Sequence, residues 1–128
     1  MPINKLFSGG MPILEQALNV RMEKQGLIQS NIANLETPGY SVQDFSFKDV
    51  MKSVQNNSGQ VMRTHSKHIA LDPIEIGRSR GGADENRPVD LDEEMMKLSE
   101  NQLMYEVAAR LIAKKFEGLK YAIDEGGK

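Results

Sequence analysis

The chain has 128 residues, 39% of them hydrophobic and 27% charged, which is an ordinary composition for one modest folded domain. Its formal net charge of −2 gives no field that would attract a nucleic acid or an anionic membrane surface, so neither partner is expected. Cysteine is absent, which excludes disulfides and thiolate catalysis, and no apolar run approaches the roughly 20 residues of a membrane span, so direct membrane insertion is not expected.

A long N-terminal helix is predicted from Pro12 onwards, because apolar residues, or polar residues that a helix interface can accommodate, recur at alternating steps of four and three. The two central positions of this stripe are polar. The stripe comprises Leu14, Leu18, Arg21, Gln25, Ile28, Ile32 and Leu35. A second apolar row widens the face beyond a two-residue seam, which indicates contact with more than one neighbour. This row comprises Ile13, Ala17, Val20 and Leu27.

The predicted helix runs into a stop signal in NIANLETPGY, residues 31–40. Thr37 precedes a proline and is therefore biased toward extended geometry, while Gly39 adopts positive φ at little cost. With Pro38 and Gly39 as its central pair, the stretch from Thr37 to Tyr40 predicts a type II turn.

The central segment, residues 41–89, differs in kind from both ends. Polar and glycine-rich stretches, QNNSG at 55–59 and GRSRGGADENRP at 77–88, separate short apolar pieces. No long helix is expected here. VQDFSF and QVM are expected to be extended or to form short strands, and the remainder to form loops.

The C-terminal segment, residues 90–128, predicts a heptad helix over 91–123 about 50 Å long. Asp90 with Glu93 three residues later is typical of a capping box. A flanking apolar row comprises Leu103, Val107 and Leu111. The predicted seam comprises Leu91, Met95, Leu98, Gln102, Tyr105, Ala109, Ile112, Phe116, Leu119 and Ile123.

Polar residues within the seams have two interpretations. Gln102 in the C-terminal seam, with Arg21 and Gln25 on the N-terminal helix, either fixes the register between the helices or is simply partly exposed. The sequence leaves both open.

Most apolar residues lie near the two ends of the sequence, so the terminal helices are expected to pair. The predicted fold is mainly α: an α-helical, coiled-coil-like hairpin with a short irregular or extended central segment that has room for a small β element. Residues 1–40, 41–89 and 90–128 together form one domain in this prediction. A single pair leaves the rows of Val20 and Leu27 and of Leu103 and Val107 partly uncovered, which favours association by several kcal/mol, at about 25 cal/mol per Å² of apolar surface buried.

No catalytic, cofactor-binding or metal site is predicted. His65 and His68, even with Asp72, do not give a recognisable set of three or four metal ligands. No serine or threonine has an evident activating base, and the acids that follow Asp90 are the residues expected in a first helical turn.

Two regions resemble one known family. NIANLETPGY is similar to the signature of bacterial flagellar axial proteins, in which Asn-x-Ala-Asn precedes a Thr-Pro-Gly-aromatic turn. ALNVRMEKQGLIQS before it, SVQDFSFKDVM after it and VDLDEEMMKLSENQLMYEVAARLIAKKFEGLKYAI near the C-terminus resemble flagellar basal-body rod proteins, and THSKHI is similar as well. Only about fifty residues separate the terminal helices, where hook and distal-rod proteins insert large β domains, so the resemblance is to the proximal rod proteins.

The resemblance implies a non-enzymatic structural subunit without a cofactor, which assembles into a helical tube and transmits torque across the periplasm. The implied partners are other copies of the chain, other rod and axial proteins, the membrane-ring end of the basal body and the flagellar type III export apparatus. Export without signal cleavage agrees with an N-terminus that lacks a basic region followed by an apolar stretch. The turn residues implied to position the exit of the central segment are Asn31, Ala33, Asn34, Thr37, Pro38, Gly39 and Tyr40.

Two other functions remain as alternatives. One is a non-flagellar coiled-coil adaptor, whose seam would bind one partner helix. The weaker one is a small hydrolase that would use the region of His65.

Overall fold

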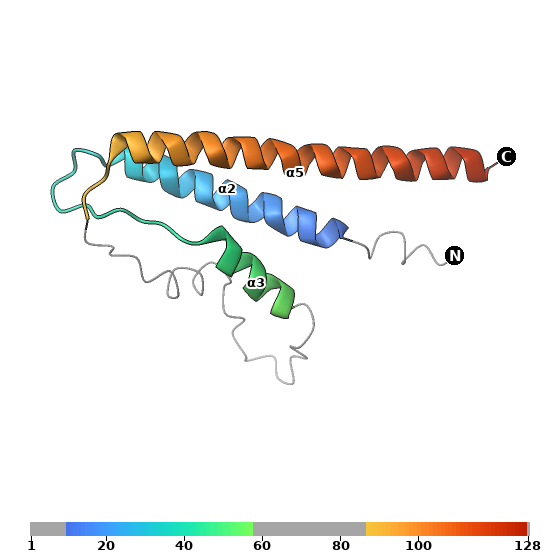
Figure 1. The fold of residues 1–128 in the computed structure, drawn as a ribbon, viewed down its shortest axis with the longest axis horizontal. Helices are drawn as coiled ribbons and strands as arrows, with labels where there is room; N and C mark the ends of the chain where they lie inside the picture. Colours follow the sequence, from blue (N-terminus) through green and yellow to red (C-terminus); the bar gives the residue numbers. More distant parts are fainter. Residues whose placement is uncertain (1–9, 58–86, 128) are drawn as a thin grey trace.

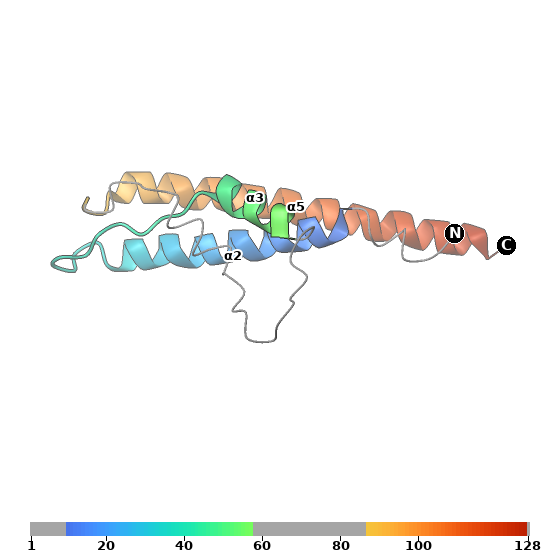
Figure 2. The same ribbon diagram turned by 90° about the horizontal axis from the view of Figure 1, so that it is seen from below.

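The computed structural model describes residues 10–57 and 87–127, which contain helices α2 (Met11–Ala33), α3 (Phe47–Asn57) and α5 (Leu91–Gly126) (Figure 1). No strand occurs within these two ranges. Helices α2 and α5 lie side by side and run in opposite directions, as both views show (Figures 1 and 2). The predicted mainly α hairpin of the terminal segments is therefore confirmed.

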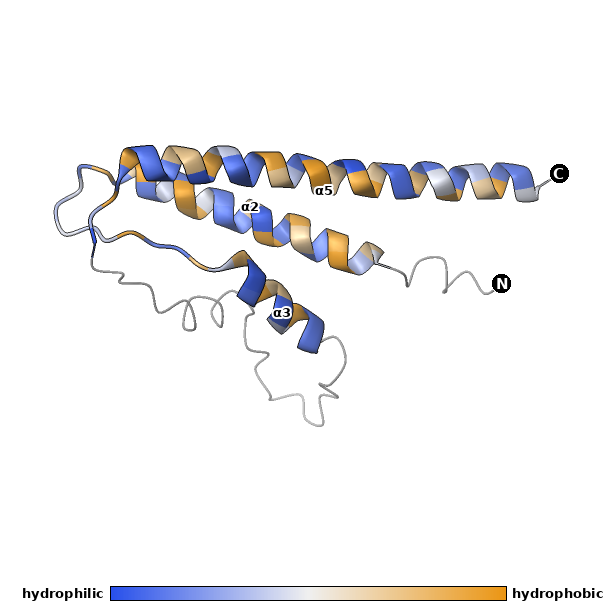
Figure 3. Cartoon of the chain, viewed as in Figure 1, coloured by the Kyte–Doolittle hydropathy of each residue, from blue (hydrophilic) through white to orange (hydrophobic). Residues whose placement is uncertain are grey.

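The two long helices differ in length. With a rise of 1.5 Å per residue, the 36 residues of α5 extend about 54 Å and the 23 residues of α2 about 35 Å. The C-terminal part of α5 consequently extends beyond the start of α2 (Figures 1 and 2). Hydrophobic residues recur along α5 into this unpaired part (Figure 3).

Helix boundaries follow local signals in the sequence. Gly10, with φ of 79°, precedes α2, and a proline lies in the first turn. Asp90 caps α5, since its Oδ1 accepts hydrogen bonds from the backbone N–H groups of Asp92, at 3.0 Å, and Glu93, at 3.3 Å. Only this half of the predicted capping box is present, because the carboxylate of Glu93 is engaged by Arg87 and Lys97 instead.

The structure differs from the sequence prediction at residues 47–57, which form helix α3 rather than an irregular or extended segment. The apolar positions in this stretch follow helical spacing, but they are few and they end in the polar run QNN, so the pattern is too short to be decisive in the sequence. The helical residues that pack on the core are Phe47, Met51 and Val54, with Val50 fully buried. The predicted loops and the QVM piece, within residues 58–86, lie outside the described residues.

A small core forms where α3 lies against α2. Val20, Phe45 and Val50 are buried together, and Leu27 packs against them. Val20 and Leu27 were expected to stay partly uncovered in a single chain, but α3 and Phe45 cover them, because the central segment folds back along α2. The expected contact of α2 with more than one neighbour is thereby confirmed.

No helix in the described part of the chain is both long enough and apolar enough to cross a membrane.

Candidate functional site

The family-like stretch forms the end of α2 and the turn that follows. The last helical residue is Ala33, and the next residue, Asn34, accepts a hydrogen bond on Oδ1 from the Thr37 hydroxyl at 3.1 Å. The backbone N–H of Tyr40 donates to the Thr37 carbonyl at 3.2 Å, and Gly39 has φ of 75°. The structure thus places a tight turn with left-handed glycine where the sequence predicts a type II turn.

Asn31 connects three separate parts of the chain. Its Nδ2 donates to the backbone carbonyl of Gln43 at 2.7 Å and to Oε2 of Glu94 at 3.0 Å. Its Oδ1 accepts from the Tyr40 hydroxyl at 2.8 Å and from the Gln43 backbone N–H at 3.0 Å. The side-chain amide therefore makes all four of its hydrogen bonds although the residue is only 1% exposed.

The second asparagine of the motif acts locally. Asn34 Nδ2 donates to the Ser30 carbonyl at 2.8 Å, in addition to the bond that this carbonyl accepts from the Asn34 backbone N–H at 3.0 Å. Ala33, Pro38 and Gly39 are exposed. Asn34 therefore acts at the helix end, while Asn31 bonds to more distant parts of its own chain.

An ionic cluster lies beside Asn31 and ties the start of α5 to residues 41–46. Lys97 Nζ lies 2.9 Å from Glu93 Oε1, 3.0 Å from Asp44 Oδ2 and 3.1 Å from Glu94 Oε1. Lys24 of α2 lies 3.4 Å from the other carboxylate oxygen of Asp44. Glu94 is 1% exposed, and its two oxygens are held by Lys97 and by the Asn31 amide, so its burial is compensated.

Charges in this cluster shift one another's protonation equilibria. Arg87 donates two hydrogen bonds of 2.6 Å to the two carboxylate oxygens of Glu93. These bonds, followed by the bond from Lys97, lower the pKa of Glu93 from 4.5 to about 2. Hydrogen bonding to Glu93 likewise raises the pKa of Arg87. Burial opposes the charge of Lys97, but its hydrogen bonds with Glu93, Asp44 and Glu94 outweigh burial and raise the Lys97 pKa.

A second polar contact joins the middles of the long helices. Asn101 is 1% exposed, and its Nδ2 donates to the Arg21 carbonyl at 2.8 Å and to Gln25 Oε1 at 3.4 Å. Its Oδ1 accepts from Arg21 Nη1 at 3.4 Å. The Arg21 guanidinium also lies 3.7 Å from the centre of the Phe47 ring, and burial lowers the pKa of Arg21 against the attraction of Glu100.

The polar partner of Arg21 and Gln25 is therefore Asn101 rather than Gln102, and of the two interpretations left open for Gln102 the structure supports exposure. Gln102 is exposed on the flank of the interface. The predicted seam was extended through Gln102 at the four-three rhythm, and hydrophobic periodicity alone does not indicate a buried amide one residue earlier.

The seam of α5 shows the same displacement of one residue. One heptad position is as predicted, because Leu98, Tyr105, Ile112 and Leu119 are half-buried. At the other predicted position, the residue one place earlier in the sequence is the buried one, as Glu94 and Asn101 show. The predicted residues, which come directly after these, therefore lie at or near the surface. The exposed residues of the predicted seam are Leu91, Met95, Gln102, Phe116 and Ile123. On α2, Ile28 is buried and Leu14, Leu18 and Ile32 are half-buried.

A row of apolar residues on α5 remains uncovered, as the sequence predicts. Leu103, Val107 and Leu111 are 60%, 46% and 48% exposed. Met96 and Met104 are exposed as well; Met96 extends the row toward the start of the helix, and Met104 lies beside Leu103. These five residues are called the outer row below.

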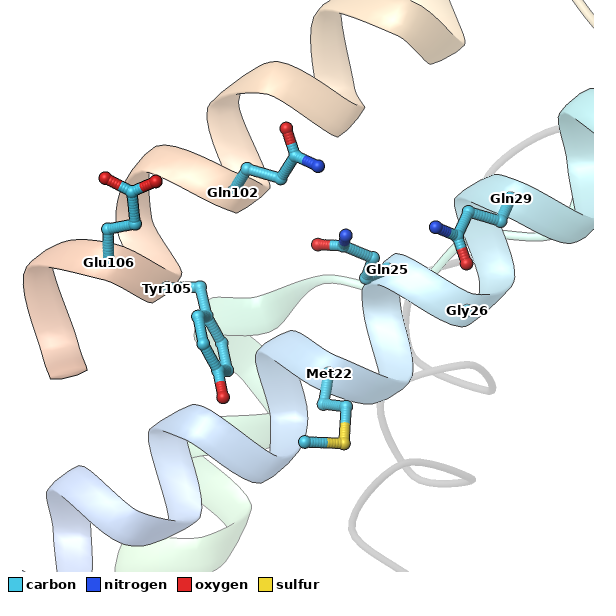
Figure 4. A pocket seen from close by; sticks show the side chains of 7 residues that line it. All are labelled: Met22, Gln25, Gly26, Gln29, Gln102, Tyr105 and Glu106. Carbon is cyan, nitrogen blue, oxygen red and sulfur yellow. The ribbon is translucent and has the colours of Figure 1, made fainter.

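A groove of about 600 Å³ lies between α2 and α5 (Figure 4). Three of its α2 residues, Met22, Gly26 and Gln29, lie on the flank away from Val20 and Leu27, which pack with α3. The other lining residues are Gln25, Gln102, Tyr105 and Glu106.

The described residues do not form a recognisable reaction centre. They contain no group of three or more His, Asp and Glu side chains placed to hold a metal ion. The acids at the start of α5 are engaged structurally: Asp90 caps the helix, and Glu93 and Glu94 pair with basic residues. His65 and His68 lie outside the described residues.

Together, the fold and the buried polar contacts define a helical hairpin in which these contacts hold the two long helices in one register. No family model matches the chain. The flagellar basal body rod protein FlgB of Bacillus subtilis is 30% identical over an alignment of 129 positions, which covers 96% of the chain and 98% of that protein. Two further FlgB proteins are similar. That of Salmonella typhimurium is 29% identical, with 88% of the chain and 91% of that protein covered. That of Aeromonas hydrophila is 28% identical, with 91% of the chain and 94% of that protein covered. The chain belongs to the family of the flagellar basal body rod protein FlgB.

Sequence reasoning missed several residues that organise the site, among them Gln43, Asp44, Glu94, Lys97 and Asn101. Glu94 was attributed only to the acids expected in a first helical turn, which complement the helix dipole, and Lys97 was given no role. A usable signal was present in the spacing, because Glu94 stands seven residues before Asn101 and both are polar at one heptad position.

Proposed function

We propose that the chain is a structural subunit of the proximal rod of the flagellar basal body, where it assembles into a helical tube that transmits torque across the periplasm. The observation that carries this proposal is the similarity over nearly the whole chain to proteins named as flagellar basal body rod proteins. A structural subunit of this kind is not an enzyme and needs no cofactor.

The outer row of α5 supports assembly. Its five exposed apolar residues are placed along one helix, where a neighbouring helix would remove them from water, at a gain of about 25 cal/mol per Å² of apolar surface buried. Contacts between different faces of successive subunits do not close on themselves, and such contacts yield helical arrays.

The buried polar contacts support transmission of torque. A slip of α5 along α2 would separate Asn101 from the Arg21 carbonyl and Asn31 from Glu94 at the same time. Each separation would leave buried polar groups unpaired, at a cost of about 1–3 kcal/mol per group. The hairpin would therefore resist sliding while force passes along it.

The partners we propose are other copies of the chain, other rod and axial proteins, the membrane-ring end of the basal body and the flagellar export apparatus. The proposed location is the periplasm-spanning rod, reached without a cleaved signal peptide. The turn from Thr37 to Tyr40 would set the direction in which residues 41–46 leave α2, since Tyr40 and Gln43 are both held by Asn31.

The test is deletion of the gene in the bacterium that encodes the chain, followed by complementation. Swimming should be lost and then restored by the unaltered gene, and the chain should be present in purified basal bodies. Pro38→Ala and Gly39→Ala, which alter the turn, should restore swimming less well. Normal swimming of the deletion strain would overturn the proposal.

The alternative, a non-flagellar adaptor, would use the groove beside Tyr105 and Gln102 for one partner helix. An adaptor should purify as a discrete dimer or trimer with its partner and should be absent from basal bodies. A rod subunit should gain helix content when it is mixed with other axial proteins, without stopping at a fixed small number of copies.

A further inference from the structure

Residues 41–57, called the strap below, make contacts with both long helices. They comprise the extended stretch after the turn and helix α3, and they fold back along α2 in both views (Figures 1 and 2). The backbone N–H of Val42 donates to the carbonyl of Arg87, just before α5, at 3.2 Å. Phe45 is buried together with Val20 of α2. The strap is therefore joined to the hairpin at several points along its length.

Three groups of side chains each combine one residue of α2, one of the strap and one of α5. The first group is centred on Asn31 of α2. Its amide exchanges two hydrogen bonds, of 2.7 and 3.0 Å, with the backbone of Gln43 in the strap, and it donates a third, of 3.0 Å, to Glu94 of α5. Asn31 and Glu94 are both 1% exposed, so this contact between the long helices is shielded from water.

A second group is centred on Arg21 of α2. Its guanidinium lies 3.7 Å from the centre of the Phe47 ring at the start of α3, and its Nη1 donates to Oδ1 of Asn101 on α5 at 3.4 Å. A guanidinium can hold both partners at once, because its flat face stacks on a ring while its edge donates hydrogen bonds. Docking of α3 and pairing of α2 with α5 therefore use the same side chain.

The group between these two brings like charges together. Lys24 of α2 and Lys97 of α5 lie 3.4 and 3.0 Å from the two oxygens of one carboxylate, that of Asp44 in the strap. The three side chains are 17%, 21% and 29% exposed, so water screens their charges only in part. Lys97 also pairs with Glu93 and Glu94, whereas Asp44 is the one acid that pairs with Lys24 in the described part of the chain. Loss of the Asp44 charge would leave Lys24 without an acid and facing a second lysine across the interface.

The docked strap carries one unpaired polar group. Ser53 lies on the packed face of α3 and is 5% exposed, and its Oγ has no hydrogen-bond partner among the described residues. A buried hydroxyl without a partner opposes docking, since the same hydroxyl would bond to water when α3 is released. Helix α3 is therefore held less tightly than its apolar contacts alone would hold it.

We infer that the strap is a register lock for the hairpin. When the strap is docked, Asp44 and Phe47 act as positioning residues that hold α2 and α5 in one register. When it is released, the two lysines lose the acid between them and Arg21 loses the ring that positions it, so the helices become free to slip. This inference goes beyond the proposed rod function, because it concerns coupling within one chain.

Thiol labelling measures both parts of the lock, because the natural chain has no cysteine. Leu98→Cys places a thiol on the half-buried face of α5, between Lys97 and Asn101 in the sequence, and reports opening of the helix pair. Val50→Cys places a thiol at a fully buried position of α3 and reports release of the strap. The rate at which a maleimide reacts with each thiol, relative to the rate in concentrated urea, measures how often that part of the chain opens.

Asp44→Asn should speed labelling of Leu98→Cys at least five-fold, although residue 44 belongs to neither long helix. Gln43→Ala is the matched control, because the Gln43 side chain is exposed and only its backbone bonds to Asn31. This control should change the rate by less than two-fold. Equal rates in Asp44→Asn and Gln43→Ala would overturn the inference.

A lysine substitution distinguishes the lock from independent ion pairs. Lys24→Gln alone should speed labelling of Leu98→Cys, since it removes a partner of Asp44. In the Asp44→Asn background the same change should slow labelling at least two-fold, because it removes the repulsion between the two helices. Lys48→Gln, which removes an exposed charge of α3, should have no effect in that background. If Lys24→Gln also has no effect there, Asp44 does not mediate between the two helices and the inference is wrong.

Ser53→Ala tests the lock without weakening the chain. Because it removes the unpaired hydroxyl, it should slow labelling of Val50→Cys at least five-fold and, through the lock, slow that of Leu98→Cys as well. Asn56→Ala at an exposed position of α3 is the control for helix propensity, and it should slow labelling by no more than about two-fold. Unless both thiols become slower together in Ser53→Ala, the strap docks independently of helix pairing and carries no lock.

The same rates can be measured in basal bodies purified from a complemented deletion strain, where they decide the matter if the free chain protects neither thiol. A chain that protects neither thiol in either setting has no lock, and this result would contradict the inference. Absence of the chain from basal bodies, together with the expected rates in the free chain, would overturn the proposed function and leave the inference intact.

Discussion

Asn31 shows how a single side chain can connect the turn, the central segment and α5. Its amide has two donors and two acceptor sites, and Tyr40, Gln43 and Glu94 use all of them. An aspartate has the same shape but has no donor when ionised, so it cannot bond to the Glu94 carboxylate or to a carbonyl. The position therefore requires an amide rather than merely a polar residue.

Asn31→Asp should lower the free energy of unfolding by about 3 kcal/mol, since it removes two buried donors and sets two carboxylates against each other. The measurement is urea unfolding of the purified chain, followed by circular dichroism at low temperature. Asn34→Asp is the matched control: Asn34 lies at the exposed helix end, and the change should cost about 1 kcal/mol or less. Equal losses at the two positions would show that Asn31 is only a local cap.

A second substitution tests the partner of Asn31. Glu94→Gln added to Asn31→Asp supplies an amide donor opposite the new carboxylate, so the double variant should be more stable than the sum of the single changes predicts. The double-mutant cycle should give a coupling of about 1 kcal/mol or more. Independent, additive losses would mean that the 3.0 Å contact contributes nothing to stability.

Glu93 should make stability depend on pH in an acidic window. Its pKa in the folded chain is about 2, below the ordinary 4.5, so its contribution is complete above pH 4.5 and is lost as the pH falls from 4.5 toward 2. Thermal unfolding midpoints of the natural chain should fall more steeply across this window than those of Glu93→Gln, and the two should converge near pH 2. The effect should be modest, because Arg87 and Glu93 are partly solvated.

The control for this titration is Glu117→Gln, which removes an exposed acid that makes no ion pair with another described residue. It should keep the steep acidic slope of the natural chain. Parallel curves for the natural chain and Glu93→Gln would contradict the assignment of acid sensitivity to the pair of Arg87 and Glu93.

At the scale of elements, the sequence predicted those features that depend on local backbone demands or long periodicity. The turn was predictable because proline and glycine restrict φ, and Gly39 indeed has φ of 75°. The existence and pairing of the long helices followed from their repeats. The exact face of α5 did not, because Glu94 and Asn101 are buried through hydrogen bonds with distant residues, and hydrophobic periodicity contains no information about such bonds.

Helix α3 was not predictable for a different reason. Eleven residues are marginal for a helix in isolation, so α3 depends on burial of Val50 and Met51 against α2. The stabilising partner lies in a remote part of the sequence, and the local pattern of residues 47–57 shows only half of the interaction.

Two glycine substitutions should shift stability in opposite directions. Gly39→Ala should cost about 1 kcal/mol, because the positive φ is strained for alanine although the surrounding space is open. Gly26→Ala lies inside α2 with nothing within 4 Å of the new Cβ, and it should stabilise the chain by up to about 1 kcal/mol. Thermal unfolding of both variants distinguishes backbone strain from crowding, and a shift of the same sign in both would contradict this account.

At the scale of the whole molecule, the apolar surface is divided between a small core and the outside. In the described part, the buried apolar residues are Val20, Ile28, Val42, Phe45 and Val50. The outer row, together with Phe116 and Ile123 near the end of α5, leaves further large apolar residues in water. A small core with much exposed apolar surface predicts marginal stability alone and a gain from association.

Val107→Glu separates folding from assembly. Val107 lies in the outer row and is 46% exposed, so a glutamate there should change the free energy of unfolding of the single chain by no more than about 0.5 kcal/mol. In an assembled rod the same carboxylate would be buried against an apolar neighbour without a partner, at a cost of several kcal/mol. Swimming and recovery of the chain in basal bodies should therefore fall sharply while the circular dichroism spectrum of the purified chain is unchanged.

Ala113→Glu is the matched control, since it adds the same charge at an exposed position of α5 that lies about 120° around the helix from Val107, outside the outer row. It should restore swimming in a deletion strain as well as the natural chain does. If Val107→Glu also restores full swimming, the outer row faces solvent in the rod, and the subunits must be held together through other surfaces. If both variants fail, the defect lies in added negative charge along α5 rather than in a particular face. Only failure of Val107→Glu alone identifies the outer row as a contact between subunits.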